Sequence, residues 1–302
     1  MPAQKSILII GSSNTDMVIK APHLPVAGET ILGGTFLMNA GGKGANQAVA
    51  AARLGGTVTF ICKTGNDIFG KQAIELFEQE GIDTSLILED PEHPSGVALI
   101  TVDEKAENCI VVASGANAHL TVQDIERAHD CFTTASIVLM QLEIPIETVA
   151  YAALYAAGLG KKVILNPAPF CHLADDLLQH ISIITPNETE ASMLTGIQVL
   201  DEVSAIQAAK HLQAKGIATV IITLGAKGAL LLHKDICTLV AAPVVHAIDT
   251  TAAGDVFNGA LAVALEEDMP MIAAVAFACK AAAVAVTRLG AQASAPYRHE
   301  FI

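Results

Sequence analysis

Short runs of β-branched and aliphatic residues alternate with longer helical stretches along most of this 302-residue chain. The predicted strands are Ser6–Ile10, Val58–Cys62, Ile137–Met140, Lys162–Leu165, Ile181–Thr185 and Thr219–Thr223. The predicted helices lie near Gly44–Leu54, Lys71–Glu80, Val122–Phe132, Ile146–Ala157 and Val203–Lys215. Such alternation indicates parallel strands joined by crossover helices, and therefore a doubly wound, three-layer α/β fold with a mostly parallel sheet.

Two segments interrupt this pattern with strand-like pieces and turns but no helix. They are residues 16–39 and 94–113. Within the second, Gly96–Asp103 and Asn108–Ala113 form a predicted hairpin joined by Glu104–Glu107. Two strand-only excursions from an α/β core predict a small β-sheet that projects from it as a lid.

No linker, low-complexity tract or internal repeat divides the sequence, so residues 1–302 are expected to form a single α/β domain carrying the lid. In a lone chain the lid would expose its sheet edges and an apolar face. Because exposed edges are normally paired or covered, we expect a homodimer assembled through the two lids.

The acidic charge balance limits the possible partners. The chain has 17 Lys and Arg against 31 Asp and Glu, a net charge of −14. This balance argues against nucleic acid or an anionic membrane as the main partner. A site for an anionic ligand would have to gather positive potential locally, from backbone amides, helix N-termini or metal ions.

The cysteines and apolar tracts predict a cytoplasmic protein. The six cysteines show no C-x-x-C pair, which is typical of free thiols in a reducing compartment. Residues 1–5 lead directly into the first predicted strand without an apolar signal core. The longest apolar tract, Met271–Thr287, is interrupted by Lys280 and is shorter than a membrane span.

The strongest local motif is Asp249–Gly259, where small residues precede a helix predicted from about Ala253 to Leu265. Small residues let a ligand approach the backbone closely, and the amides of a first helical turn bind anions. Asp255 would place a carboxylate beside that anion, to take a proton from an attacking hydroxyl or to hold a metal. Alternatively, Asp255 only complements the helix dipole, and the local pattern does not decide between these interpretations.

Glycines surround Lys43 in the segment Asn39–Gln47, and Asn46 follows one helical turn later. This composition predicts a flexible strand-to-helix joint that presents amides and polar side chains. It is not a P-loop, because G-x-x-x-x-G-K-[ST] does not occur in the chain. An ordinary glycine turn before a helix is the alternative.

Two further motifs follow predicted strands. In Pro186–Glu190, Asn187 and Glu190 have the spacing of a capping box, which the local pattern favours. The functional alternative is that Glu190 holds a water-coordinated Mg²⁺. Thr223 ends a strand and opens into the turn Gly225–Gly228, at the kind of strand end where open α/β sheets bind ligands. A simple β-turn explains the same residues.

Polar residues also follow two other predicted strands. Asn14 and Asp16 come after the first strand, and Glu143 follows Ile137–Met140. Side chains of this kind could bind sugar hydroxyls, although polar residues are also common at protein surfaces. The ten histidines show no H-x-x-x-H pairing and no G-x-S-x-G motif is present, so neither a histidine metal site nor a serine hydrolase is predicted.

In their order and approximate spacing, these motifs resemble the ribokinase-like carbohydrate kinases. The matching segments are Gly41–Asn46, Pro186–Glu190 and Asp249–Asp255, with Gly11–Asp16, Gln141–Glu143 and Thr287–Gln292, and the resemblance covers nearly the whole chain. The resemblance implies transfer of the γ-phosphoryl group of ATP to a primary hydroxyl of a small sugar, with O5 of D-ribose favoured. It also implies Mg²⁺ and activation by a potassium-like monovalent cation.

The resemblance implies roles for individual residues. Asp255 would be the catalytic base, and the amides of Ala252, Ala253 and Gly254 would form an anion hole. The implied sugar contacts are Asn14, Asp16, Gly42, Lys43, Gly44, Asn46, Glu143 and Asp255. The implied nucleotide site comprises Asn187, Thr223, Gly225, Lys227, Gly228, Gly254 and Cys279, with Glu190 placing Mg²⁺ through water. The implied ligands of the monovalent cation are Asp249, Thr251, Ala285, Arg288, Gly290 and Ser294.

Three other functions are weighed against this one. A kinase of the same family could act on deoxyribose, fructose or a nucleoside, although Asn14 and Asp16 favour a fully hydroxylated sugar. A non-catalytic sugar-binding regulator would be natural without Asp255, whose presence counts against it. A nicotinamide dehydrogenase would carry a G-x-G-x-x-G motif after a strand, which this chain lacks.

Overall fold

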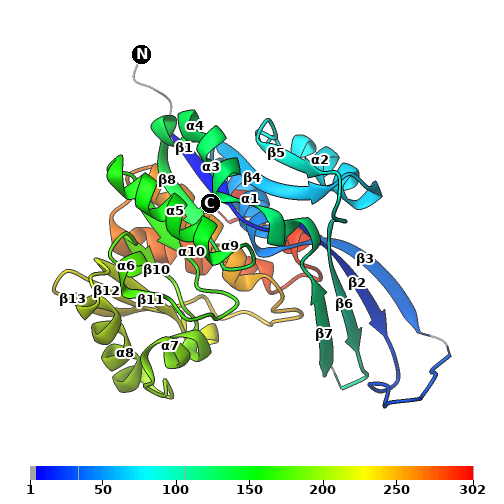
Figure 1. The fold of residues 1–302 in the computed structure, drawn as a ribbon. Coiled ribbons are helices and arrows are strands. Elements are labelled where there is room, and N and C mark those ends of the chain that lie inside the picture. The colour runs from blue at the N-terminus through cyan, green and yellow to red at the C-terminus, as the bar shows by residue number, and fades with distance from the viewer. Residues whose placement is uncertain (1–4, 33, 106, 302) are drawn as a thin grey trace.

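The computed structural model describes residues 5–32, 34–105 and 107–301 and contains a large and a small β-sheet (Figure 1). The large sheet has the strand order β13-β12-β11-β10-β9-β8-β1-β4-β5. Its strands are β1 (Ser6–Ile10), β4 (Val58–Gly65), β5 (Ile87–Asp90), β8 (Ala135–Met140), β9 (Lys162–Leu165), β10 (Ile183–Ile184), β11 (Thr219–Thr223), β12 (Ala229–His233) and β13 (Ile236–Val240). Among the described pairings of this sheet only β11 with β12 and β12 with β13 are antiparallel, so the predicted mostly parallel sheet is confirmed.

Helices cover both faces of the large sheet and complete three layers. One face packs against α1 (Lys43–Arg53), α2 (Ile68–Gln79), α9 (Ala253–Glu266) and α10 (Met271–Ala285). The other packs against α3 (Val122–Arg127), α4 (His129–Thr134), α5 (Ile146–Gly158), α6 (Asp175–Leu178), α7 (Glu188–Thr195) and α8 (Glu202–Ala214). Because strand side chains alternate, Ile7 and Ile9 face the first group while Leu8 and Ile10 face the second. Burial on both faces explains why these strands are continuous apolar runs.

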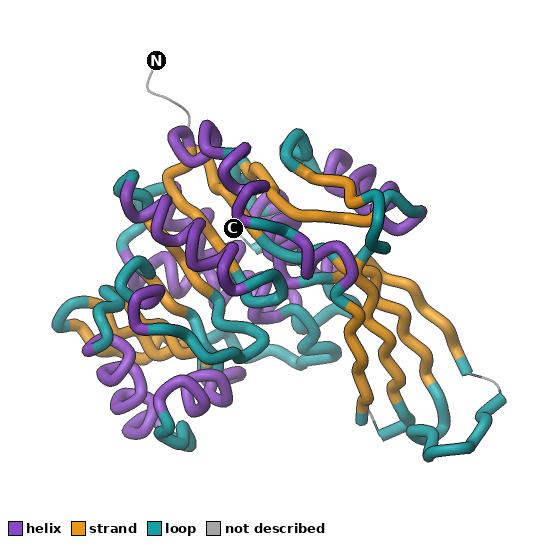
Figure 2. Tube along the Cα trace, in the orientation of Figure 1, coloured by secondary structure: helices purple, strands orange, loops and turns teal. Residues whose placement is uncertain are grey.

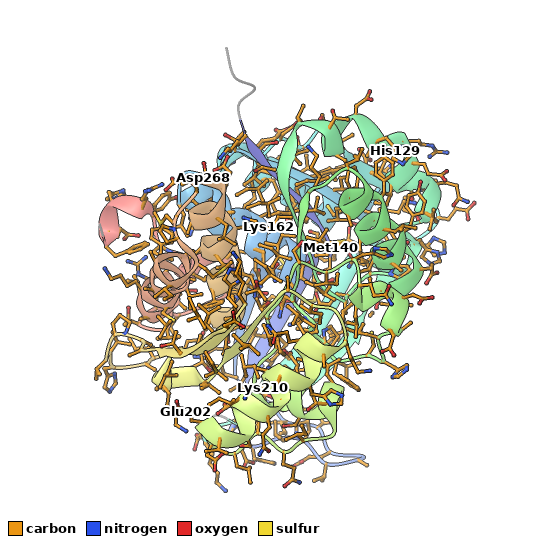
Figure 3. All side chains as sticks on the ribbon, turned by 90° about the vertical axis from the view of Figure 1, so that its left-hand side faces the viewer. His129, Met140, Lys162, Glu202, Lys210 and Asp268 are labelled. Carbon is orange, nitrogen blue, oxygen red and sulfur yellow. The ribbon has the colours of Figure 1, made fainter. Side chains whose placement is uncertain are left out.

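In this three-layer arrangement, side chains of the central sheet are buried and the outer surfaces of the helices carry charged side chains. Figure 3 shows Met140 of β8 within the packed layers, where it is fully buried, and Glu202 and Lys210 on α8, whose surface faces solvent.

The small sheet projects from the helix-covered body (Figure 2). Its order is β3 (Thr35–Gly41), β2 (Asn14–Lys20), β6 (Gly96–Val102), β7 (Asn108–Ala113). The predicted hairpin is confirmed, since β6 and β7 pair antiparallel, and β6 joins β2 in parallel. Two positions in the predicted lid segments lie outside the described residues: Gly33, in the first segment, and Ala106, in the hairpin connection of the second. We call this four-stranded sheet the lid.

The structure adds β5, β13 and α6, which were not predicted, and three further differences from the predicted elements concern packing. The helix predicted over Val122–Phe132 is two helices, because bonds of the i→i+3 type tighten the chain on both sides of Ala128. This break allows Ile125 and Phe132 both to be fully buried. The strand predicted over Ile181–Thr185 shortens to two residues, since the Ser182 hydroxyl rather than a backbone carbonyl accepts the bond from the Val163 amide.

The third difference concerns the apolar tract Met271–Thr287, for which no element was predicted. Most of it is α10, and its buried alanines pack closely against α9. Within the described ranges, no helix combines the length and the apolarity that crossing a bilayer would require.

Candidate active site

The carboxyl ends of β1 and β8 mark the point where the connections of the large sheet diverge. The chain leaves β1 toward β4 on one side, and leaves β8 toward β9 on the other. Ligands bind at such switch points in open α/β sheets because the loops there separate and leave a crevice. Ser12 and Asn14 follow β1, and Glu143 follows β8, so predicted sugar contacts from distant parts of the sequence meet here.

Two cavities are lined largely by loops that follow the strands. The larger, of about 360 Å³, is lined by Asn14, Val112, Ser114, Asn117, Ala118, Leu142, Glu143, Ile144, Pro145 and Pro169. The smaller, of about 190 Å³, is lined by Lys43, Asn166, Ala168, Thr185, Asn187, Glu190, Thr223, Thr250, Ala252, Ala253, Gly254, Asp255 and Asn258. The first contains predicted sugar contacts beside lid residue Val112. The second contains the predicted base, the predicted anion hole and part of the predicted nucleotide site.

Lys43 and Glu143 connect the two cavities. The Lys43 Nζ lies 3.8 Å from Glu143 Oε1, and the Lys43 backbone amide donates to Glu143 Oε2 at 2.9 Å. The Ser12 hydroxyl donates to the same oxygen at 2.5 Å. Burial alone would lower the pKa of the Lys43 ammonium, but the nearby Asp255 and Glu143 carboxylates raise it above its ordinary value. A permanent positive charge therefore stands between the cavities.

Asp255 lies in the first turn of α9, buried in the wall of the smaller cavity. Asn46 Nδ2 donates to its Oδ2 at 2.8 Å, and Gln47 Nε2 donates to its Oδ1 at 3.0 Å. Burial raises the pKa of the Asp255 carboxyl, while Lys43 and the two amide donors act in the opposite direction. Each carboxylate oxygen keeps accepting capacity for a further proton donor.

Asn46 is a predicted sugar contact with one unused atom. Its Oδ1 is buried and has no hydrogen-bond partner among the described residues. Because a buried acceptor without a partner costs free energy, this atom is suited to accept from a ligand hydroxyl, although Asn46 is not among the residues that line either cavity.

Asp16 of β2 lies close to the glycine-rich joint before α1. A Cβ on Gly41 would overlap the Asp16 carboxylate, so any side chain there would displace that carboxylate. Burial, and secondly the Glu143 carboxylate, raise the pKa of Asp16 to about 6. Gly42 has φ 90° and ends the turn into α1, a conformation that glycine adopts without strain.

Asn117 is a site residue that the sequence patterns missed. Its Nδ2 donates to Asn14 Oδ1 at 2.8 Å, and its Oδ1 accepts from the Ser13 amide at 2.9 Å. These bonds fix the amide of Asn14, a predicted sugar contact, in one orientation. Asn117 lies in a short 3-10 helix, Gly115–His119, about a hundred residues from Asn14, and no local motif marks it.

The capping interpretation of Asn187 and Glu190 is confirmed. Asn187 Oδ1 accepts from the Glu190 amide at 2.8 Å, and Glu190 Oε2 accepts from the Asn187 amide at 2.9 Å. Both residues also line the smaller cavity, so capping does not exclude the second role. Burial raises the pKa of Glu190, and the Asp255 charge contributes in the same direction. Two carboxylates near one anion site suit a divalent cation.

The remaining predicted nucleotide-binding residues lie in three different places: at the smaller cavity, at the surface and in the core. Thr223 lines the smaller cavity and bridges to Asn187, and the turn after it, which includes Gly225 and Lys227, is exposed. Gly228 follows with φ 106°. Cys279 lies in the core on α10, with its thiol directed at the Val240 carbonyl. It lines neither cavity, and burial raises its pKa to about 11.

At the start of α9 the chain turns through Ala252, which has φ 59°. The Ala253 amide donates to the Thr250 carbonyl at 3.2 Å, and Asn258 Nδ2 donates to the Gly254 carbonyl at 2.8 Å. The first bond occupies the Ala253 amide, a predicted anion-hole donor, and the second fixes the first turn of α9, where amide dipoles converge.

The predicted cation ligands lie on the loop before α9 and on the end of α10 with the loop after it, and Asp249 joins these two segments. Its carboxylate accepts from the Thr251 amide and from the Gly290 amide, each at 2.9 Å. The Ala285 carbonyl ends α10 and accepts from the Arg288 amide. The Arg288 guanidinium pairs with Glu300, and the buried Ser294 hydroxyl donates to the Ala291 carbonyl.

Residues 4–298 match the family model described as the pfkB family carbohydrate kinases. The chain belongs to this family, which confirms the class predicted from its motifs. A ribokinase of Haemophilus influenzae is 48% identical over 98% of this chain and 97% of its own. A deoxyribokinase of Salmonella typhi is 38% identical over 98% of this chain and 97% of its own.

A solved structure of Arabidopsis thaliana ribokinase, complexed with ribose and ATP, has the same fold. Its TM-score is 0.92 at 31% identity, covering 98% of this chain and 97% of the other. The ribokinase-like α/β fold with a separate small sheet is thus established for this chain.

Proposed function

We propose that this protein transfers the γ-phosphoryl group of ATP to O5 of D-ribose, giving ribose 5-phosphate and ADP. The observation that carries the proposal is the position of Asp255, beside the small residues that start α9 and within a cavity reached by Lys43. Family membership and the 48% identical ribokinase support the same chemistry.

The sugar is assigned to the larger cavity, beneath the lid. Asn14, Asp16 and Glu143 would bind its hydroxyls, and Asn46 Oδ1 would accept from one of them. The backbone of the Gly42–Gly44 joint lies beside these groups. A site built to hydrogen-bond hydroxyls discriminates strongly against a sugar that lacks one, because its buried polar groups then remain unpaired.

The phosphates of ATP are assigned to the smaller cavity. Asn187 and Thr223 line this cavity and would contact the nucleotide, and the Gly225–Gly228 turn would extend the nucleotide site outward. Glu190 would hold Mg²⁺ through water; one of its oxygens caps α7 and the other remains available. Mg²⁺ supplies charge neutralisation on the phosphate oxygens. A contact between the adenine and the neighbourhood of Cys279 remains a prediction.

In the proposed reaction Asp255 accepts the proton of the attacking hydroxyl. The amides of Ala252, Ala253 and Gly254 and the Lys43 ammonium stabilise charge on the transferring group. To bind the transferring group, the Ala253 amide would release the Thr250 carbonyl and donate to the anion instead. The lid would exclude water, which would otherwise accept the phosphoryl group.

A monovalent cation is assigned to the two segments joined by Asp249. Backbone carbonyls near Thr251, Ala285, Arg288, Gly290 and Ser294 would supply its oxygen ligands. The cation would order the loop that precedes the anion hole. Potassium should raise turnover, and an equal ionic strength of a bulky organic cation should not; equal rates in the two salts would remove this site.

A homodimer through the lid is proposed from the apolar surface of that sheet. The register places Phe36, Leu99 and Val111 on one face, with exposed fractions of 59%, 56% and 62%. An apolar sheet face of this kind is normally covered. The free thiols of exposed Cys109 and Cys237 suit the reducing cytoplasm.

The substrate is tested by measuring kcat/KM for ribose, deoxyribose, fructose and a nucleoside with ATP. We expect ribose to have the highest value. The 38% identical deoxyribokinase makes deoxyribose the relevant rival. A higher value for deoxyribose would overturn the assignment of ribose and leave the kinase chemistry intact.

A further inference from the structure

A row of buried side chains connects the end of β8 to the proposed base. Gln141 follows β8, Gln47 lies in α1, and both are fully buried. Gln141 Nε2 donates to Gln47 Oε1 at 2.6 Å, and Gln47 Nε2 donates to Asp255 Oδ1 at 3.0 Å. The second hydrogen of Gln47 Nε2 goes to Asn166 Oδ1 at 3.1 Å. Every polar atom of the Gln47 side chain therefore has a partner.

The direction of these bonds follows from the chemistry of Asp255. An ionised carboxylate only accepts, so Gln47 must present its NH₂ group to Asp255 and its oxygen to Gln141. Gln141 must then present its own NH₂ group. Its Oε1 is left without a partner among the described residues, packed where a Cβ on Gly11 would overlap it. Turning Gln141 over would set its Oε1 against Gln47 Oε1. The unpaired Gln141 Oε1 is therefore the less costly arrangement.

The side-chain amides of Asn46 and Gln47, which both donate to Asp255, differ in how firmly their orientation is fixed. Asn46 has an Oδ1 without a partner among the described residues, and it can turn over only where Asp255 is neutral, because the ionised carboxylate accepts and does not donate. Gln47 cannot, because Gln141 and Asn166 use its remaining polar positions. One oxygen of the carboxylate thus has a fixed donor and the other an adaptable one.

We propose that Gln47, oriented by Gln141, is a positioning residue that fixes the Asp255 carboxylate for proton abstraction. This inference rests on the proposed function. A base held in one orientation keeps its free lone pair directed at the hydroxyl, and small misplacement at this step costs rate rather than binding. The Gln47 donor also favours the ionised form of Asp255.

The charged groups around Asp255 determine the pH at which it works. Lys43 favours the ionised carboxylate, whereas Glu143, Glu190 and Asp16 disfavour it. Removing the Gln47 donor takes away stabilisation of the charged form only. The acid limb of the kcat profile should then move to higher pH, since a protonated Asp255 cannot accept the hydroxyl proton.

The test compares Gln47→Met, Gln141→Met and Thr148→Val. The methionines keep approximate volume and remove the donors. Thr148 is also fully buried, donates to the Leu120 carbonyl at 2.7 Å from α5, and lines neither cavity. It therefore reports the effect of losing a buried hydrogen bond elsewhere.

For Gln47→Met we expect kcat to fall about tenfold or more, with KM for ribose and ATP within about twofold of wild type. The acid limb of kcat should shift upward in pH. Gln141→Met should show the same two changes at smaller size, and it decides the matter if Gln47→Met does not fold. Thr148→Val should lower the melting temperature without moving the pH profile.

An unshifted acid limb together with wild-type kcat in both glutamine variants would overturn the inference. So would an equal loss of kcat in Thr148→Val. If Asp255→Asn is inactive while the glutamine variants keep full turnover, only this inference fails. If Asp255→Asn keeps full turnover, the proposed function itself fails.

Discussion

The buried side chains around Asp255, which we call the wall, and the lid differ in the kind of side chain that each buries and exposes. The wall buries polar groups and pairs most of them internally, through Asn46, Gln47 and their partners, while Asn46 Oδ1 and Gln141 Oε1 have no partner among the described residues. The lid leaves apolar groups such as Phe36 and Leu99 at the surface. A group that must act on a bound ligand needs a fixed environment, whereas a cover must be able to separate from what it covers. The comparison predicts that changes in the wall affect rate and that changes on the exposed apolar face of the lid affect assembly.

The largest effect is expected from Asp255→Asn. This variant keeps the shape of the side chain but cannot accept the hydroxyl proton, so kcat should fall by about 10²–10⁴-fold. Asn46 can turn over so that its unused Oδ1 accepts from the new amide, and the melting temperature should therefore hold. Turnover and melting temperature are measured on one preparation. Wild-type turnover would contradict the role of Asp255 as base and restore its interpretation as a complement to the helix dipole.

Gly41→Ala should have the next largest effect. The new methyl group would overlap the Asp16 carboxylate and displace it, so KM for ribose should rise about tenfold, equivalent to about 1.4 kcal/mol. KM for ATP should change little. Gly158→Ala is the control, because a Cβ there has no neighbour within 4 Å. Equal KM values for ribose in the two variants would mean that Asp16 does not contact the sugar.

A charge on the lid should change assembly more than catalysis. Leu99→Lys places an ammonium on the exposed face of β6, and the dissociation constant of the dimer should rise at least about tenfold. Leu154→Lys on α5 is the matched control, since Leu154 has a similar exposed fraction of 53%. Solution mass is measured across micromolar concentrations. A monomeric wild type, or two variants that dissociate alike, would remove the lid as the interface.

The smallest effect concerns pH. Asp16 has its pKa raised to about 6, so it is ionised above this pH and protonated below it. Protonation removes an acceptor for sugar hydroxyls, and affinity should weaken as pH falls. KM for ribose should about double between pH 7.5 and 6, because half of the groups are then protonated. Asp16→Asn should have a raised KM that is constant over this range; the same pH dependence in the variant would assign the effect to another group.

The sequence by itself determined the layers and the chemical class. Continuous apolar strands such as Ser6–Ile10 and Lys162–Leu165 are required by burial on both faces, so local composition was enough to identify them. The Asp249–Gly259 motif was also visible, because anion binding by a helix N-terminus depends on consecutive residues. Elements set by distant packing were less visible: α10 lacks a polar face because it packs within the body, and β10 is shortened by the hydroxyl of Ser182.

Only the tertiary structure decided which polar groups meet. The bonds from Asn117 to Asn14 and from Gln141 through Gln47 to Asp255 join residues about 90 to 210 positions apart. Hydrogen bonds between such residues form because the sheet brings the carboxyl ends of its strands to one edge, and no local pattern records that meeting. The sequence also left Asp255 divided between base and dipole partner. Its burial beside Lys43, with a donor on each oxygen, is a property of the folded chain alone, since charge and desolvation depend on distance in space.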